Sequence, residues 1–258
     1  MPKTISIVVP VLNEPRIGRS LDSIISQKIV DEVEVIVVDG GSDRATLDQI
    51  EARRSDIDKF ISEPDDGIYD AMNKGIAAAT GDVIGILNSD DRYVDENVLQ
   101  DVLDRLGDEN LDGTYADLDM VQDDGRLSRR WSSRECKRWR FYYGWMPPHP
   151  TLFLRRSVYE RFGSFDTAYR ISADYEFMLR LIMRERIRLA YINRVLVHMS
   201  PGGQSNGTVS GVVAANIEVY RAWRNNGLKW GFLVPVLKPA SKAPQFLFAK
   251  VAALRQHS

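Results

Sequence analysis

The most informative segment of the chain is Gly81-Asp82-Val83-Ile84-Gly85-Ile86-Leu87-Asn88-Ser89-Asp90-Asp91. It joins a short apolar strand to a group of side-chain oxygens without Lys or Arg. In an open α/β sheet, ligands bind outside the carboxyl ends of the strands. Carboxylate and amide oxygens at that place suit a hard divalent cation such as Mg²⁺ or Mn²⁺, which in turn suits a diphosphate. Taken alone, however, the segment favours a simpler interpretation, in which Asp90 and Asp91 cap the next helix or form a turn.

Strand and helix patterns alternate on both sides of this segment. Strand-like apolar runs cover residues 5–9, 33–38, 60–62 and 83–87. The helices between and after them are marked by residues at helical spacing, namely Ile17, Leu21, Ile24 and Ile25, then Leu47 and Ile50, then Tyr69, Met72, Asn73 and Ile76, and finally Val98, Leu99, Val102, Leu103 and Leu106. We expect Gly81 to end the third helix and Asp95 to cap the fourth. This order predicts an α/β protein whose mainly parallel central sheet is flanked by helices.

The second half of the chain is less regular. We expect a strand over 114–121, a hairpin turn at Asp123-Asp124-Gly125 and short strands at 188–191 and 195–198. A helical stripe is formed by Tyr175, Met178, Leu179 and Ile182. Because no linker or internal repeat divides the chain, we expect a single domain over 1–218, with halves at 1–110 and 111–218, followed by an extension over 219–258.

Composition and charge narrow the function classes. Of the 258 residues, 44% are hydrophobic and 27% charged, which is typical of a soluble globular protein. A formal net charge of −2 gives no general attraction to nucleic acid, so no nucleic-acid partner is expected. Cys136 is the single cysteine, which rules out an internal disulfide and suits a reducing compartment. We expect neither a signal peptide nor a membrane-spanning segment, and therefore a cytoplasmic location.

The extension over 219–258 differs in composition from the rest. It has no Asp or Glu but seven basic residues, Arg221, Arg224, Lys229, Lys238, Lys242, Lys250 and Arg255. Trp, Phe and Leu lie between them. This mixture suits the surface of an anionic membrane. The alternative is a helical extension that packs on the body or on a second subunit, as in a homodimer.

Each early strand ends in polar residues, at Asn13-Glu14, at Asp39 with Ser42-Asp43, at Asp65-Asp66 and at Asn88–Asp91. One polar strand end is weak support for a site, but four at one sheet edge describe one. The chain has no G-x-G-x-x-G after its first strand and no P-loop, which argues against a dinucleotide-dependent dehydrogenase or a P-loop enzyme. A nucleoside diphosphate would then be held mainly through a metal, with Asp39 free to accept from a base N–H.

Three motifs together carry a family resemblance: Val8-Val9-Pro10-Val11-Leu12-Asn13-Glu14, Val37-Val38-Asp39-Gly40-Gly41-Ser42-Asp43, and Gly81-Asp82 through Asn88-Ser89-Asp90-Asp91. In this order they resemble family 2 glycosyltransferases of the GT-A fold, which is built on a Rossmann-like sheet. The segment Glu63-Pro64-Asp65-Asp66-Gly67-Ile68-Tyr69-Asp70-Ala71-Met72-Asn73-Lys74-Gly75 is similar to a branch common among bacterial O-antigen and exopolysaccharide enzymes. The resemblance runs from about Ile5 to about Ser205.

The resemblance implies a nucleotide-sugar half over 1–110 and an acceptor half over 111–218. Asp39 would contact the uracil of a UDP-sugar, and the remaining donor-binding residues would be Pro10, Asn13, Glu14, Ser42, Asp66, Asn73, Lys74, Asn88 and Ser89. Asn88-Ser89-Asp90 stands where the family has Asp-x-Asp, so Asp90 would be the metal ligand, with Asp91 close by. Asn88 replaces the first Asp of that motif, which removes one negative charge. The implied cofactor is Mg²⁺ or Mn²⁺.

In the second half, Ile171-Ser172-Ala173-Asp174-Tyr175-Glu176 resembles the family segment that carries the catalytic base, which would be Asp174, although Ala173 replaces a frequent acid. An inverting transfer needs one carboxylate to take the proton of the acceptor hydroxyl. The alternative is that Asp174 only stabilises a helix N-terminus. His198 is a candidate to close over the metal diphosphate, and His149 is expected to shape the acceptor side.

Basic and aromatic residues interleave between Arg126 and Trp145. This pattern could stack nucleic-acid bases, stack sugar rings, or contact the phosphates of a lipid-linked acceptor. A solvated loop with a few core aromatics explains it equally well.

The sequence therefore predicts an inverting, metal-dependent hexosyl- or N-acetylhexosaminyl-transferase. It would move a sugar from a UDP-sugar to a saccharide, carried on a polyprenyl diphosphate at the inner face of the cell membrane, in polysaccharide biosynthesis. One rival is a sugar-1-phosphate nucleotidyltransferase, but Pro10-Val11-Leu12-Asn13-Glu14 is not the Gly-rich basic loop such an enzyme needs. A non-catalytic nucleotide-sugar-binding protein is the other rival, because Asn88 and Ala173 both depart from the family pattern.

Overall fold

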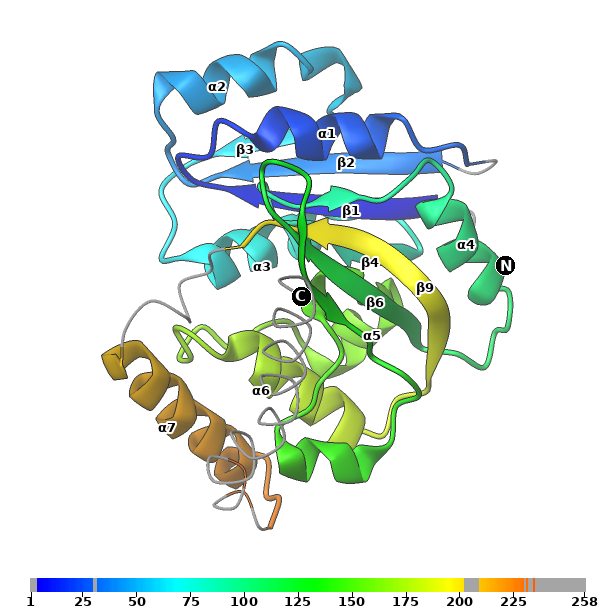
Figure 1. The fold of residues 1–258 in the computed structure, drawn as a ribbon, viewed down its shortest axis with the longest axis vertical. Helices are drawn as coiled ribbons and strands as arrows, with labels where there is room; N and C mark the ends of the chain where they lie inside the picture. The colour runs from blue at the N-terminus through cyan, green and yellow to red at the C-terminus, as the bar shows by residue number, and fades with distance from the viewer. Residues whose placement is uncertain (1–3, 30–31, 202–208, 230, 232–233, 235–258) are drawn as a thin grey trace, which may run out of the picture.

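The computed structural model describes residues 4–29, 32–201, 209–229, 231 and 234 (Figure 1). Its first half contains four parallel strands in the order β3-β2-β1-β4. They are β1 (Thr4–Val11), β2 (Glu32–Asp39), β3 (Lys59–Ser62) and β4 (Val83–Ile86). The helices that connect them are α1 (Ile17–Ile25), α2 (Arg44–Glu51) and α3 (Ile68–Ala78), with a short 3-10 turn, η1 (Arg54–Asp56), after α2.

Both faces of this parallel sheet are buried. Val8, Ile36 and Val38 pack in one core with α3, whereas the alternate residues Ile7 and Val37 pack in a second core with α1 and α2. Successive side chains of a strand point to opposite faces, so near-continuous apolar runs are needed to fill both cores. The strands predicted at 5–9, 33–38, 60–62 and 83–87 are thus confirmed, and so are the helices that follow them.

The second half extends the same sheet with mixed strand directions. Its strands are β5 (Arg92–Tyr93), β6 (Gly113–Val121), β7 (Leu127–Trp131), β8 (Phe153–Arg155) and β9 (Leu189–Met199). The order continues as β4-β8-β6-β9-β5, with β7 paired to β6 as the predicted hairpin. β8 is antiparallel to both β4 and β6, whereas β9 is parallel to β6. The parallel order inferred from the first half therefore stops at β4.

The remaining elements are α4 (Val98–Arg105), η2 (Arg138–Tyr143), η3 (His149–Thr151), α5 (Arg156–Phe162), α6 (Ala173–Leu179), a π-helical turn η4 (Arg180–Arg184) and α7 (Val209–Asn225). Figure 1 shows α6 and α7 side by side, below the sheet in this view. The boundary predicted between residues 218 and 219 falls inside α7, whose residues Val219, Ala222 and Trp223 are buried. Within the described ranges, no helix is long and apolar enough to cross a membrane.

Three local predictions are wrong. The strands expected at 188–191 and 195–198 form one strand, β9, because its pairing with β6 continues through two register shifts. Asp95 does not cap α4, which begins after Asn97; its carboxylate instead lies 2.5 Å from Arg194. Gly81 does not end α3, which stops at Ala78. A Cβ at Gly81 would lie 2.8 Å from the backbone nitrogen of Ser6, so glycine lets the loop pass close over β1.

Candidate active site

The polar ends of the parallel strands meet at one edge of the sheet. Asp39, the last residue of β2, lies in register with Val11 of β1 and Ser62 of β3. Its carboxylate is fully buried and accepts hydrogen bonds from the Ser42 backbone N–H (2.9 Å) and the Ser62 hydroxyl (2.7 Å). These contacts fix the carboxylate at the carboxyl edge of the sheet, where a donor nucleotide is expected to bind.

Asn13 fastens the loop after β1 to the loop after β2. Its backbone has φ of 51°, in the left-handed region that Asn tolerates better than most residues. Its N–H donates to the Ser42 hydroxyl (2.9 Å), and its side-chain oxygen accepts from the Asp43 N–H (2.8 Å). Pro10 lies buried in β1, in register with Val38. Pro10, Asn13, Asp39 and Ser42 are therefore gathered in one place.

The loop after β3 packs on the same edge. A Cβ at Gly40 would lie 2.3 Å from the Asp65 carboxylate, so a larger residue at position 40 would require the Asp65 side chain to move. Asp66 follows on the exposed surface. Lys74 holds this loop from α3, because its ammonium donates to the Pro64 carbonyl (2.9 Å) and lies 3.0 Å from Glu63.

Asn73 connects the two halves of the chain. Its amide donates to the Phe165 carbonyl (2.8 Å) and accepts from the Phe165 N–H (3.0 Å). This reciprocal pair fixes α3 against the segment that leads to α6. Asp66 thus lies in the loop after β3 and Lys74 contacts this loop, whereas Asn73 contacts the backbone of Phe165.

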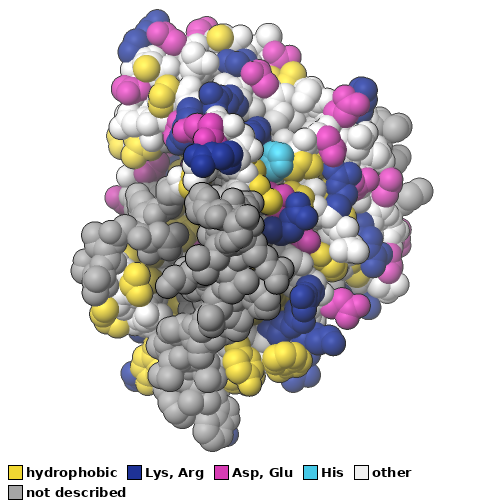
Figure 2. All heavy atoms as spheres, in the orientation of Figure 1, with side chains coloured by type: hydrophobic (Ala, Val, Ile, Leu, Met, Phe, Trp, Pro, Cys, Tyr) yellow, Lys and Arg dark blue, Asp and Glu magenta, His cyan; other side chains and the backbone are white. Residues whose placement is uncertain are grey.

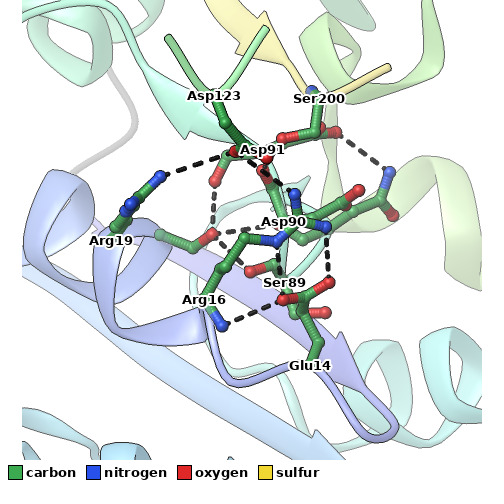
Figure 3. Close-up of polar contacts among 10 residues, drawn as sticks. Glu14, Arg16, Arg19, Ser89, Asp90, Asp91, Asp123 and Ser200 are labelled. Atoms are coloured by element: carbon green, nitrogen blue, oxygen red, sulfur yellow. Dashed lines mark hydrogen bonds and ion pairs between the residues drawn. The ribbon is translucent and has the colours of Figure 1, made fainter. Parts of the chain in front are cut away.

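The loop after β4 is held from two sides. The Ser20 hydroxyl of α1 lies within hydrogen-bonding distance of the carbonyls of Ser89 (2.8 Å) and Asp91. On the other side, the Ser200 hydroxyl donates to the Asp90 carbonyl (2.7 Å), and the Ser200 N–H donates to the Asp91 carboxylate (3.1 Å). Figure 3 shows Ser200 beside Asp90 and Asp91. Nothing in its sequence context points to Ser200, which reaches the loop because β9 ends there.

The two aspartates of this loop differ in environment. Asp91 is 1% exposed, and burial, followed by the charge of Asp90, raises its pKa to about 8. Asp90 is half-buried; burial raises its pKa, and the nearby Glu14 carboxylate adds to this effect. A cation placed against Asp90 would lower the pKa values of both aspartates, because positive charge favours the ionised forms of these carboxyl groups.

An arginine that the sequence interpretation missed lies beside this pair. Arg16 makes two hydrogen bonds of 2.8 Å to the Glu14 carboxylate, and these lower the pKa of Glu14. The same guanidinium lies 3.4 Å from Asp123 in the β6–β7 turn, and Arg19 lies 3.7 Å from the same carboxylate (Figure 3). Glu14 is therefore positioned by Arg16, and the tip of the hairpin reaches the rim of the site.

Asp174 lies in the first turn of α6. Its Oδ1 accepts from the Tyr175 N–H (2.8 Å) and from the Tyr69 hydroxyl of α3 (3.2 Å). Its Oδ2 lies 3.6 Å from Nδ1 of His149. The loop before it is fixed from α7, since the Glu218 carboxylate accepts from the backbone N–H groups of residues 170, 171 and 172 at 2.9, 3.0 and 2.8 Å.

His149 contacts both halves of the site. Its Nε2 lies 3.4 Å from the amide nitrogen of Asn88, while its Nδ1 faces Asp174. Burial lowers the pKa of His149, although the Asp174 and Asp90 carboxylates act in the opposite direction. His149 was expected to shape the acceptor side, and the structure adds its contact with the loop after β4.

The oxygens of this loop fit a divalent cation in part. Oδ1 of Asn88 is buried without a hydrogen-bond partner, and the Asp90 carboxylate is close by in the same loop. Among the described residues, no three His, Cys, Asp or Glu side chains form a group that could hold a metal ion. The groups that could contribute to holding a cation are Oδ1 of Asn88 and the Asp90 carboxylate, since proteins commonly bind Mg²⁺ through one or two carboxylates together with substrate phosphates.

His198 lies on β9, in register with Arg92 of β5 and Asp119 of β6. Burial and then the charge of Arg92 lower its pKa. The contacts to Asp90 and Asp91 come instead from Ser200, two residues further along.

The basic and aromatic segment between Arg126 and Trp145 forms β7 and η2. Phe141 is fully buried, and Tyr142 packs on Trp223 of α7 with ring centroids 4.8 Å apart. Trp139 and Tyr143 are 57% and 46% exposed. Figure 2 shows hydrophobic side chains beside Lys and Arg at the lower end of this face, where η2 lies in Figure 1. The segment therefore supplies both core aromatics and an exposed basic surface.

Comparison with known proteins identifies the family. The model of Glycosyl transferase family 2 matches residues 6–168. This chain belongs to glycosyltransferase family 2. It is 30% identical over 211 residues to the "PGL/p-HBAD biosynthesis glycosyltransferase" of Mycobacterium bovis (strain BCG / Pasteur 1173P2), covering 79% of this chain and 80% of that protein. An uncharacterized glycosyltransferase of Mycobacterium tuberculosis (strain ATCC 25618 / H37Rv) is 31% identical over 187 residues, covering 69% and 68% of the two chains.

Solved structures show that this family 2 glycosyltransferase has the expected GT-A fold. S. aureus TarS 1–349 in complex with UDP superposes with a TM-score of 0.68 at 18% identity, covering 89% of this chain and 68% of that one. The chain spans 41% of the longer S. aureus TarS structure. The mannosyltransferase PcManGT from Pyrobaculum calidifontis, in complex with GDP-Man and Mn²⁺, superposes with a TM-score of 0.60 at 20% identity, covering 98% and 80%. The fold and the glycosyltransferase class predicted from the sequence are thereby confirmed.

Proposed function

We propose that this glycosyltransferase moves a hexosyl or N-acetylhexosaminyl group from a UDP-sugar to a saccharide with inversion at the anomeric carbon. The observation that carries the proposal is the meeting of three groups. Buried Asp39 and the Asn88–Asp90 loop lie on one sheet edge, and Asp174 is joined to the same region through His149. A carboxylate for the nucleoside, oxygens for a diphosphate-bound cation and a base for the acceptor are the parts that such a transfer needs.

The donor is assigned from the environment of Asp39. Its carboxylate keeps acceptor capacity beyond the two hydrogen bonds that it receives, and a uracil N–H is a matching donor. Similar folds bind UDP, UDP-GlcNAc and GDP-Man. Pro10, Asn13, Glu14, Ser42 and Ser89 would line this part of the site.

Asp90 and Asn88 Oδ1 would hold a divalent cation, Mg²⁺ or Mn²⁺, with Asp91 behind them and His198 near the end of β9. When bound, the cation would supply positive charge that stabilises the departing diphosphate. The half-burial of Asp90 and the unpartnered Asn88 oxygen favour this assignment.

Asp174 would act as the general base. Its Oδ1 already accepts two hydrogen bonds, so Oδ2 is the oxygen left to accept the proton of the acceptor hydroxyl. The acceptor hydroxyl oxygen attacks the anomeric carbon as its proton passes to Asp174. The bond to the nucleoside diphosphate breaks on the opposite face of the sugar, which inverts the configuration. Tyr69 and the N-terminus of α6 keep the carboxylate directed to the site.

The acceptor would be a saccharide on a lipid carrier such as a polyprenyl diphosphate, in the biosynthesis of a cell-surface polysaccharide such as O-antigen or exopolysaccharide. The exposed rings of Trp139 and Tyr143 suit a sugar. Their basic neighbours Lys137 and Arg138 suit a phosphate. The chain would then work at the inner face of the cell membrane. Most of the basic residues predicted to contact lipid lie at 238–255, outside the described residues.

The donor assignment is tested by incubating the protein with a panel of UDP- and GDP-sugars and measuring nucleotide release, with Mn²⁺ and with EDTA. We expect release from one or a few UDP-sugars only, and its loss in EDTA. Release from GDP-sugars alone would overturn the donor assignment, and full release in EDTA would overturn the metal assignment.

Membrane association is tested by sedimentation with anionic liposomes. A chain that ends after Asn225 should lose the association shown by the full chain. Equal sedimentation of both would show that the extension is not the anchor, and a loss of dimerisation instead would assign the extension to a subunit interface.

A further inference from the structure

The backbone of His149 is rigid. The residue lies between Pro148 and Pro150, whose rings restrict the local backbone. Buried Thr151 then fixes the turn, because its hydroxyl contacts the carbonyls of Pro148 (2.9 Å) and Ala116 (3.1 Å). The turn therefore restricts the backbone from which the His149 ring reaches Asn88 and Asp174.

The mixed order of the sheet brings this turn to the site. β8 begins directly after η3 and runs antiparallel to β4, with Phe153 in register with Gly85. The start of β8 therefore lies near the carboxyl end of β4, which is the edge that carries Asn88. A parallel strand in this position would have placed η3 at the opposite edge.

The Asn88 amide has two N–H groups, and both are directed to neighbours. Its nitrogen donates to Oδ2 of Asp91 (3.1 Å) and lies 3.4 Å from Nε2 of His149. Its oxygen, Oδ1, is buried and has no hydrogen-bond partner. The two contacts of the nitrogen thus leave the carbonyl oxygen as the free group of the side chain.

The neighbours of His149 favour one tautomer. With the proton on Nδ1, the ring presents N–H to Asp174 and a lone pair to the Asn88 amide. The other tautomer would set N–H against N–H at Asn88 and a lone pair against the Asp174 carboxylate. The distance of 3.6 Å between Nδ1 and Oδ2 is longer than a hydrogen bond, so this side of the ring is a close electrostatic contact.

We propose that His149 is a positioning residue that turns Oδ1 of Asn88 toward the donor diphosphate and its cation while holding the Asp174 carboxylate toward the acceptor. The proposal rests on the function proposed above and adds a reason for this residue. An aspartate at position 88 would present two equivalent oxygens and need no orientation. An amide has one oxygen, so its direction decides whether an oxygen or an N–H faces a cation.

The test is a double-mutant cycle on the binding of UDP in the presence of Mn²⁺, measured by calorimetry without any acceptor. His149→Phe keeps a ring but removes both nitrogens, and we expect it to weaken binding about tenfold, or about 1.4 kcal/mol. In the Asn88→Asp background the same change should alter binding by less than about twofold. His149→Gln, which keeps one donor and one acceptor, should restore most of the affinity.

Three outcomes overturn the proposal: unchanged affinity in His149→Phe, an equal loss in the Asn88→Asp background, or no recovery in His149→Gln. Thermal unfolding of each variant accompanies the cycle, and a variant that does not fold is replaced by His149→Leu, for which the expectations are the same. If wild-type protein binds no UDP with Mn²⁺, the proposed donor or metal is wrong and this inference falls with it. If wild-type protein binds UDP but the effect of His149→Phe on UDP affinity is the same in the wild-type and Asn88→Asp backgrounds, only the role of His149 is refuted.

A second readout concerns Asp174. At saturating donor and Mn²⁺, His149→Phe should still lower kcat, whereas adding His149→Phe to Asp174→Asn should lower it no further. Additive losses in kcat would show that His149 does not act through Asp174.

Discussion

In the first half of the chain, Asp39 and the Asn88–Asp91 loop lie at the carboxyl ends of parallel strands, β2 and β4. In the second half, Asp174 lies instead on a seven-residue helix, α6, that does not directly follow a strand. The donor-side groups are placed by the ends of parallel strands, and side chains such as Ser20 and Ser200 then hold the loop after β4. The base is fixed by side chains from three other elements, Tyr69 on α3, His149 in η3 and Glu218 on α7. Substitutions should therefore separate donor binding from chemistry.

The largest expected effect is on the base. Asp174→Asn should lower kcat by a factor of about 10²–10⁴, because the carboxylate that takes the acceptor proton is lost. The affinity for UDP with Mn²⁺ should stay the same, since Asp174 lies outside the nucleotide site. Single-turnover kinetics and calorimetry measure the two quantities. Loss of UDP binding in this variant would contradict the prediction that substitutions at the base leave donor binding unchanged.

The next effect is on donor affinity, with little change in turnover. Asp39→Asn should raise the dissociation constant for UDP about tenfold to a hundredfold, because hydrogen bonds to a charged group are worth about 1.5–3 kcal/mol. Turnover at saturating donor should change little. The same substitution at Asp48, on the exposed surface of α2, is the matched control. An unchanged UDP affinity in Asp39→Asn would remove this residue from the nucleotide site.

A third effect concerns stability and pH in metal-free protein. Burial raises the pKa of Asp91 from 3.8 to about 8, so between these values the folded chain binds more protons than the unfolded one. Stability should then fall as pH rises through this window, by at most about 1.4 kcal/mol per pH unit from this residue. Asp91→Asn cannot ionise and should show a flatter dependence. Urea unfolding in EDTA across the window measures it, and parallel curves for the two proteins would contradict the assignment.

The smallest effect tests how the base is held. Glu218→Gln weakens the contacts with the backbone N–H groups of residues 170–172 and should lower kcat about fivefold, corresponding to about 1 kcal/mol. The affinity for UDP should not change. Glu51→Gln, on the exposed surface of α2, is the control. A change in UDP affinity without a change in kcat would show that Glu218 acts on the donor side.

The same contrast explains what the sequence could and could not predict. The sequence located Asp39, Asn88 and Asp90 because each comes at or just after the end of an apolar run. Parallel strands bring their carboxyl ends to one edge of the sheet whatever the details of packing. The donor-side arginine, Arg16, was missed although it lies only two positions after Glu14, and its second contact, with Asp123, joins residues 107 positions apart. The pairing with Glu14 could have been proposed from the sequence, whereas no local pattern records the contact with Asp123.

In the second half, the position of Asp174 at a helix start was predicted, but the residues that hold it were not. Glu218 is the last acidic residue before the acid-free extension, and that was the one available signal. His149 was noticed, yet its contact with Asn88 depends on the antiparallel β8, and strand direction in the mixed part of the sheet was not predictable from apolar runs. Its role in catalysis stays a prediction.

The link between Glu218 and the loop before Asp174 spans 46 residues at Ser172. Glu218 therefore couples the position of α7 to the loop that leads to the base. A displacement of α7 would change the direction of Asp174 and leave the register of the four parallel strands unaltered. Helix α7 is thus a point from which the rate of transfer could be tuned without a change in donor affinity.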